Sequence, residues 1–251
     1  PPDHPDLAIT YNTIGSVYSQ MGRYSESLSN YEKALEIQQK SLPPDHPDLA
    51  ITYNTIGSVY LQMGRYSESL SNYEKALQIQ QKSLSPDHPD LATTYNNIGS
   101  VYLQMGRYSE SLSNYEKALK IRQKSLPPDH PDLATTYNTI GSVYLQMGRY
   151  SESLSNYEKA LEIQQKSLPP DHPDLATTYG NIGVVYSKMG RYLESLSNYE
   201  KALEIQEKYL PADHPNLAIS YDRIAVARAG LNRHSEDIAL GAVMEKSSKI
   251  D

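Results

Sequence analysis

The chain has 251 residues, with 23 Lys and Arg against 30 Asp and Glu, a net charge of −7, and no cysteine. This acidic balance argues against binding to nucleic acid or to an anionic membrane, because both need a basic face. The absence of cysteine excludes a disulfide framework and thiolate metal sites, and no apolar run approaches the roughly 20 residues that span a bilayer. We therefore expect a cytoplasmic protein without a membrane segment or a signal peptide.

The sequence repeats with a period of 42 residues. Residues 43–84 read PPDHPDLAITYNTIGSVYLQMGRYSESLSNYEKALQIQQKSL, and residues 127–168 repeat them with two changes. A fixed period of this length predicts a solenoid, in which each repeat buries its apolar face only against its neighbours. We expect a single array with repeats at 1–42, 43–84, 85–126, 127–168 and 169–210, followed by a degenerate C-terminal capping repeat at 211–251.

The first predicted helix of each repeat is illustrated by residues 43–84. The prolines of the PPDHP turn cannot continue a preceding helix, because proline lacks the amide hydrogen and crowds the previous turn. We expect Asp45 to cap the N-terminus of the new helix and Gly64 to end it. The apolar residues recur at helical spacing, which places these side chains on one stripe: Leu49, Tyr53, Ile56, Tyr60 and Met63.

A second helix is predicted to start near Tyr66 and to run to the end of the repeat. Its apolar residues also have helical spacing, and Gly57 and Ala76 are small positions that should let the two helices approach closely. The short loop between the helices makes them antiparallel neighbours. The expected fold class is all-α, an α–α superhelix (solenoid) of stacked antiparallel helix hairpins.

These residues resemble a known repeat family. Tyr53-x2-Ile56-Gly57-x2-Tyr60, followed by Ser69-x3-Tyr73 and Ala76, is similar to the tetratricopeptide repeat pattern. The 42-residue period and the segments DHPDLATTYN and YEKALEI resemble the repeats of kinesin light chain and of nephrocystin-like proteins. The resemblance implies a right-handed superhelix and a non-enzymatic scaffold for protein–protein interaction, which binds an extended peptide segment in its concave groove.

In the family, the first helix of each repeat lines the groove. By motif position the resemblance assigns these residues to peptide binding: Asn12 and Ser16; Asn54, Ser58, Leu61 and Gln62; Asn96, Ser100, Leu103 and Gln104; Asn138, Ser142, Leu145 and Gln146. An asparagine amide offers both donors and an acceptor, so a ladder of asparagines could bond the backbone of an extended peptide. The alternative interpretation is that the asparagines are solvated surface residues copied with the repeat. The fifth copy changes this face, with Gly180, Val184 and Lys188.

Catalytic and metal chemistry is not predicted. An enzyme needs different side chains that converge on one point, whereas each repeat supplies the same ones. The histidines of the PDHP turns should lie about 10 Å apart, the usual helix-packing distance, which is too far to share a metal. We interpret them as turn residues, and His234 with Glu236 and Asp237 as polar surface. No cofactor is expected.

Two functions remain open from the sequence. The first is a protein-interaction module for a protein or peptide partner. The second is a structural, self-associating spacer with no dedicated ligand, in which an uncovered apolar flank of the first hairpin stacks head to tail on another copy. In the last repeat Arg228 replaces a core tyrosine, which suits a capping repeat whose outer face meets water.

Overall fold

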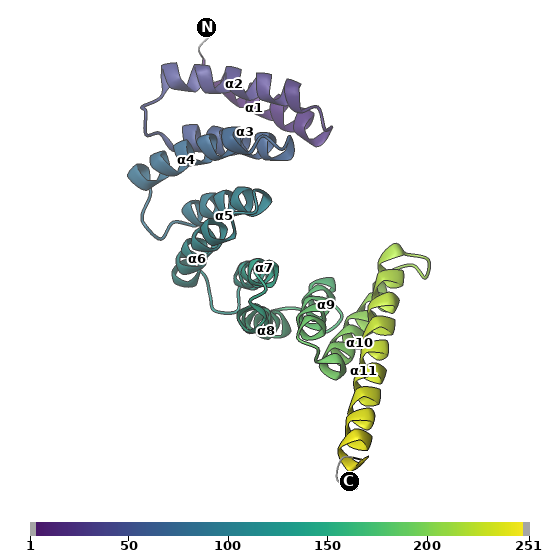
Figure 1. Ribbon diagram of the computed structural model, residues 1–251. Coiled ribbons are helices and arrows are strands. Elements are labelled where there is room, and N and C mark those ends of the chain that lie inside the picture. Colours follow the sequence, from purple (N-terminus) through teal and green to yellow (C-terminus); the bar gives the residue numbers. More distant parts are fainter. Residues whose placement is uncertain (1–3, 248–251) are drawn as a thin grey trace. The chain divides into compact units, whose positions relative to one another are not determined.

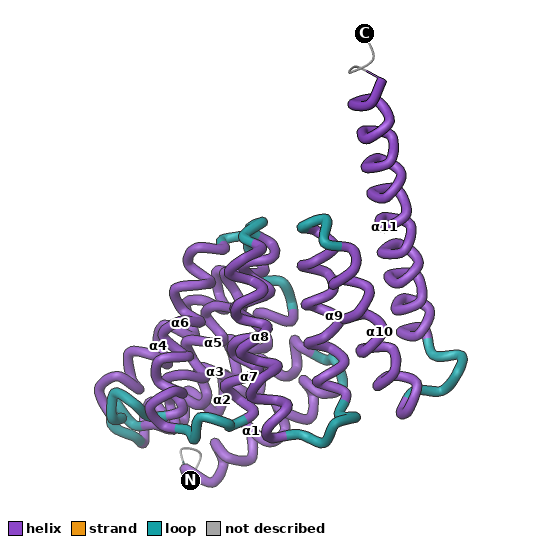
Figure 2. The backbone as a smooth tube through the Cα atoms, turned by 90° about the horizontal axis from the view of Figure 1, so that it is seen from below, coloured by secondary structure: helices purple, strands orange, loops and turns teal. Residues whose placement is uncertain are grey.

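The computed structural model describes the backbone of residues 4–247 and the side chains of residues 4 and 6–233. These residues form eleven α-helices joined by short loops, and the described part of the chain contains no strand (Figures 1 and 2). The fold class is therefore the all-α, helix-hairpin repeat class that the periodicity predicted. The helices recur with the 42-residue period of the sequence.

The chain divides into two compact units, Pro1–Pro127 and Pro128–Asp251, and this division falls between the third and fourth copies of the repeat. Unit 1 contains α1 (Pro5–Gln20), α2 (Tyr24–Ser41), α3 (Pro47–Gln62), α4 (Tyr66–Ser83), α5 (Pro89–Gln104) and α6 (Tyr108–Ser125). Unit 2 contains α7 (Pro131–Gln146), α8 (Tyr150–Ser167), α9 (Pro173–Lys188), α10 (Tyr192–Tyr209) and α11 (Pro215–Ser247). Below, the odd-numbered helices α1 to α9 are called helices A, and the even-numbered ones are called helices B.

The N-terminus of each helix A is capped by histidine, so the expectation that Asp45 caps the helix is wrong. The Nδ1 atom of His46 accepts a hydrogen bond from the Asp48 backbone N–H at 3.2 Å. Pro47 is the first helical residue, and a residue before proline is held in the extended region, which places the cap one position later than expected. The same bond recurs at His4, His88, His130, His172 and His214.

The turn between the two helices of a hairpin depends on glycine. Gly64 has φ +71°, a left-handed conformation that glycine adopts without strain, and α3 ends two residues before it. Arg65 then lies over the ring of Tyr60, 4.6 Å from its centroid, and its Nη2 contacts the Glu68 carboxylate at 2.6 Å. The predicted stop at Gly64 and the predicted start of the second helix at Tyr66 are both confirmed.

The core lies between consecutive hairpins, as expected for a solenoid. Tyr73 of α4 is fully buried and packs with Ile98 and Val101 of the following helix A. Equivalent clusters form around Tyr31 with Ile56 and Val59, Tyr157 with Ile182 and Val185, and Tyr199 with Ile224 and Ala227. Within each unit, a hairpin therefore buries its apolar stripe against the next one along the chain.

The sixth copy forms one long helix instead of a hairpin. Asn232 stands where the other copies have the turn glycine, and α11 continues through this position. The backbone of Gly230 lies against the ring of Tyr192, which lets α11 pack closely on α10. Arg228 is exposed and contacts Glu200 at 3.0 Å, so the charge that replaces a core tyrosine meets solvent. The capping role of residues 211–251 stays a prediction, because the side chains beyond Arg233 lie outside the described residues.

Candidate binding face

The helices A of each unit form a surface that is here called the A face, and it carries the residues that the resemblance assigns to peptide binding. Neighbouring helices A touch directly: α3 contacts α5 in unit 1, and α7 contacts α9 in unit 2. The four assigned asparagines are all half-buried: Asn12, Asn54, Asn96 and Asn138. They are therefore not simply solvated side chains on an open helix surface.

The asparagines link one repeat to the next. Asn54 Nδ2 donates to Thr94 Oγ1 at 2.9 Å, and the fully buried Thr94 hydroxyl donates to Gln80 Oε1 at 2.7 Å. The same asparagine-to-threonine bond joins Asn12 to Thr52 at 3.3 Å and Asn138 to Thr178 at 2.9 Å. One amide hydrogen of each of these three asparagines is thus already used inside the protein.

The carbonyl oxygens of two asparagines are enclosed by the protein. Asn12 Oδ1 and Asn138 Oδ1 are shielded from solvent and have no hydrogen-bond partner among the described residues. Because an asparagine amide has two N–H donors, the second hydrogen is the group that remains for a bound peptide carbonyl. Part of the hydrogen-bonding capacity of the asparagine ladder is therefore used inside the protein. A bound peptide backbone would find free N–H donors on these side chains more easily than free carbonyl acceptors.

The assigned serines support the buried tyrosines. Burial raises the pKa of the Tyr73 hydroxyl above its usual range, and hydrogen bonds with Ser58 and Ser69 oppose that rise. Ser69 Oγ also donates to the Gly57 carbonyl at 2.7 Å. The same relation to a core tyrosine holds for Ser16, Ser100 and Ser142. These serines are half-buried and belong to the contact between the two helices of a hairpin as well as to the A face.

The assigned glutamines and leucines differ in exposure. The glutamines are exposed near the ends of their helices: Gln62, Gln104 and Gln146. Leu61 and Leu145 are half-buried and pack against the clusters around Tyr73 and Tyr157, and Leu103 is also half-buried. The glutamines are therefore open to a partner, whereas Leu61 and Leu145 mainly support the core between repeats.

A pocket of about 470 Å³ opens on the A face between α1 and α3. Asn12 and Ser16 line it together with two isoleucines, Ile9 and Ile51, whose exposed fractions are 63% and 55%. The assignment by motif position missed both isoleucines. The sequence held a signal for them, because copies 3 to 5 carry threonine at the equivalent position while copies 1 and 2 carry isoleucine.

The fifth copy reshapes the A face of unit 2. Gly180 stands where the first four copies have the ladder asparagine, and a cavity of about 280 Å³ lies beside it. Arg223 of α11 approaches this space, with its Nη1 3.7 Å from the position that a Gly180 Cβ would take. Of the other changed residues, Lys188 is exposed, whereas Val184 packs against the cluster around Tyr199.

The structure gives the turn histidines a capping role and does not gather metal ligands around them. Within residues 4–233 no group of three or more His, Asp or Glu side chains is arranged to hold a metal ion. His234, Glu236 and Asp237 lie outside the residues whose side chains are described.

Comparison with known proteins defines the class. The tetratricopeptide repeat family model matches residues 6–82, 48–124, 90–166, 132–208 and 174–236, at the same 42-residue step as the helices. The chain belongs to the tetratricopeptide repeat family. A fold of this kind is a scaffold for protein–protein interaction. No curated protein matches the chain.

Several solved structures share the fold. A kinesin light chain-like protein of Podosopora anserina with nearly identical TPR-like repeats superposes with a TM-score of 0.74 at 23% identity, covering 83% of this chain and 99% of that one. BtubC (BKLC) from P. vanneervenii gives a TM-score of 0.74 at 24% identity, covering 84% and 85%. The apo form of RapI gives 0.71 at 20% identity, covering 80% and 70%. In addition, no helix in the described part of the chain is long and apolar enough to cross a membrane.

Proposed function

We propose that the A face binds an extended peptide segment of a partner protein, and that the chain acts as a non-enzymatic, cytoplasmic interaction scaffold. The observation that supports this most directly is the pocket between α1 and α3. There two exposed isoleucines, Ile9 and Ile51, flank a polar floor that contains Asn12 and Ser16.

The chemistry of this pocket fits one apolar peptide side chain and the backbone beside it. The two isoleucines would cover an aliphatic or aromatic side chain, because burying apolar surface contributes roughly 25 cal/mol per Å². The free amide hydrogen of Asn12 would donate to a peptide carbonyl. In unit 1 the equivalent amides of Asn54 and Asn96 would extend the same contact along the A face, with Gln62 and Gln104 at its edge. In unit 2 Asn138 and Gln146 offer the same groups on the A face of that unit.

The experiment is selection of a dodecapeptide display library on the chain, followed by affinity measurement for the best peptide. The variants are Ile9→Thr and Ile51→Thr, which install the residue that Thr93, Thr135 and Thr177 already provide in other copies. Because those copies fold with threonine, the variants should keep the wild-type melting temperature. We expect binding of the selected peptide to weaken by roughly tenfold, about 1.4 kcal/mol. Unchanged binding would exclude the pocket as the peptide site.

A further inference from the structure

The first five copies of the repeat are so alike that a charge change in one of them stands out. On α6 Lys120 occupies the position of Glu36, Gln78, Glu162 and Glu204 in the other four. Lys117, Lys120 and Lys124 then follow one another at helical spacing along one side of α6. In a chain with a net charge of −7, this cluster of lysines is a local exception.

The change at Lys120 alters the ion pairs around it. In the first and fourth copies the late lysine of helix B pairs with a glutamate one turn earlier, Lys40 with Glu36 at 2.9 Å and Lys166 with Glu162 at 2.6 Å. In the third copy the position one turn before the late lysine is occupied by Lys120 instead of a glutamate. The late lysine, Lys124, contacts Asp87 of the preceding loop at 3.0 Å. Like charges four residues apart on a helix are unfavourable, so this arrangement does not stabilise α6.

Lys120 faces a pocket between repeats and has no hydrogen-bond or ion-pair partner among the described residues. The pocket has a volume of about 380 Å³ and lies between α4, α5 and α6. Its apolar part is formed by Leu84, Leu91 and Ile121, and its polar part is formed by Gln81, Tyr95, Asp87 and the three lysines. Lys117 lies over the ring of Tyr95, with its Nζ 5.4 Å from the centroid. Of the three cations, Lys120 is therefore the one left for a ligand.

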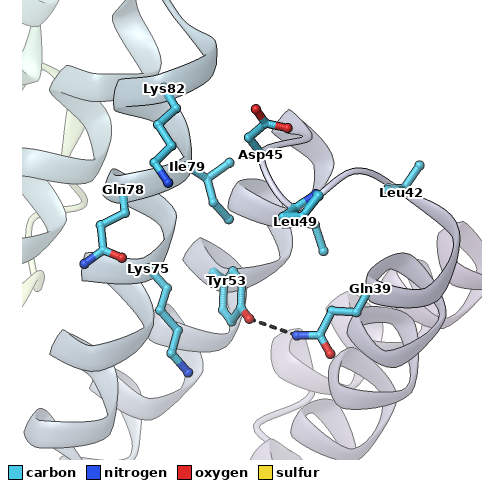
Figure 3. A pocket seen from close by; sticks show the side chains of 10 residues that line it. Gln39, Leu42, Asp45, Leu49, Tyr53, Lys75, Gln78, Ile79 and Lys82 are labelled. Carbon is cyan, nitrogen blue, oxygen red and sulfur yellow. Dashed lines mark hydrogen bonds between the residues drawn. The ribbon is translucent and has the colours of Figure 1, made fainter.

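The preceding repeat contains a matched pocket without this cation. It has a volume of about 530 Å³ and the same framework, in which Tyr53 receives a hydrogen bond from Gln39 at 3.0 Å. Figure 3 shows Lys75, Gln78 and Lys82 along α4 on one side of this pocket, with α2 on the other side. Gln78 is the residue that corresponds to Lys120. The two pockets thus share their framework and differ in the charge at one lining position.

We propose that the pocket between α4, α5 and α6 binds an acidic peptide segment of a partner protein, with a carboxylate at Lys120 and an aliphatic side chain against Leu84, Leu91 and Ile121. Charge complementarity supports this occupant, because three lysines and one aspartate surround an apolar floor. The site shares no lining residue with the A-face pocket, so it does not depend on the function proposed above.

The test is fluorescence anisotropy with a labelled peptide of alternating aspartate and leucine, at low and at physiological ionic strength. The comparison peptides replace aspartate by asparagine or by phosphoserine. We expect the aspartate peptide to bind more tightly than the asparagine peptide and to lose affinity as salt rises, because the lysines are exposed and screened. Equal binding of the aspartate and asparagine peptides would overturn the proposal. If only the phosphoserine peptide binds, the pocket recognises a phosphate group, and the proposal of a bound carboxylate is wrong.

The variants use residues that other copies already tolerate at this position. Lys120→Gln should weaken binding by about two- to fivefold, the range for one exposed ion pair. Lys120→Glu should weaken it by tenfold or more, because it also restores the pairing seen between Glu162 and Lys166. Gln78→Lys should strengthen binding at the matched pocket by the same factor of about two to five, so that the two pockets bind the peptide equally. If Lys120→Glu binds as the wild type does, the assignment is wrong. The Ile9→Thr variant should leave binding of the acidic peptide unchanged. A failure of the proposed A-face site can therefore be distinguished from a failure of the proposed site at Lys120.

Discussion

Gly57 of α3 lies directly against the ring of Tyr73 of α4. A Cβ atom built on Gly57 would lie 2.9 Å from both Cδ1 and Cε1 of that ring, closer than side-chain carbons approach in proteins. The ring is 1% exposed and is enclosed by Ile98 and Val101 of the next hairpin, so it has no room to move away. The absence of a side chain at Gly57 therefore sets how closely the two helices of the hairpin pack.

Replacing Gly57 by leucine should destabilise the protein. Overpacking of a well-filled core costs typically about 1–3 kcal/mol, and the ring of Tyr73 cannot yield without disturbing the next repeat. We expect a lower thermal midpoint, followed by circular dichroism at 222 nm. The control is Gln62→Leu on the same helix, which adds an equally large side chain at an exposed position. A Gly57→Leu protein that melts with the wild type would disprove the packing described for this contact.

The sequence was sufficient to locate the helices and their buried stripes, because those features depend on nearby residues. Gly64 and the PPDHP turns act within a few residues of the boundaries that they set, and the helical spacing of Ile56 and Tyr73 reports which side faces the core. The exception was the cap at His46. There Pro47 fixes the first helical residue, and the restriction on the residue before a proline outweighed the general preference for aspartate as a cap.

The role of the A-face side chains could not be predicted from sequence. Asn54 forms a hydrogen bond with Thr94, which lies 40 positions later in the sequence. Whether the two side chains are in contact depends on the distance between neighbouring helices A. Motif position assigned the asparagine to a ligand without this internal bond. Gln80 and Thr94 are both buried, although their polar side chains suggest a surface position. The hydrogen bond from the Thr94 hydroxyl to Gln80 Oε1 satisfies both groups inside the protein.

Thr94→Val tests the structural half of the asparagine ladder. Valine keeps the shape of threonine and removes the hydroxyl, so the buried Gln80 Oε1 loses its donor and Asn54 Nδ2 loses its acceptor. Leaving buried polar groups unpaired costs about 1–3 kcal/mol, and we expect stability measured by urea unfolding to fall by that amount. Thr93→Val on the exposed side of the same helix should change stability by less than about 0.5 kcal/mol. Equal effects of the two substitutions would contradict the network.

Gly180→Asn should restore in the fifth copy the side chain that the first four copies carry. The new amide would reach Ser220, the counterpart of Thr178, and fill part of the 280 Å³ cavity. The Arg223 guanidinium lies 3.7 Å from the new Cβ, an ordinary contact distance. Glycine inside a helix is also less favourable than asparagine by a few tenths of a kcal/mol. We expect a stability gain of about 0.5–1 kcal/mol, measured as a higher thermal midpoint, and a lower midpoint would show that the open space is required.

The buried tyrosines should make the protein sensitive to alkaline pH. Burial raises the pKa of the hydroxyl above its usual value in Tyr31, Tyr73, Tyr115, Tyr157 and Tyr199. A group whose pKa is higher in the folded state stabilises the protein fully below its unfolded pKa of about 10, and this contribution is lost as pH rises through the folded pKa. We therefore expect stability to fall above about pH 10, with these five hydroxyls ionising together with unfolding.

Absorbance at 295 nm reports tyrosinate, and the part of its rise that comes from these five buried hydroxyls should appear as a distinct last stage when it is followed together with circular dichroism. The last stage should coincide with loss of helix, because the rings between hairpins reach solvent only when the stack opens. Tyr73→Phe removes one such hydroxyl and should reduce the amplitude of the last stage. A single smooth titration of all tyrosines, with the helical signal unchanged, would show that these hydroxyls ionise without unfolding and would contradict their burial between the repeats.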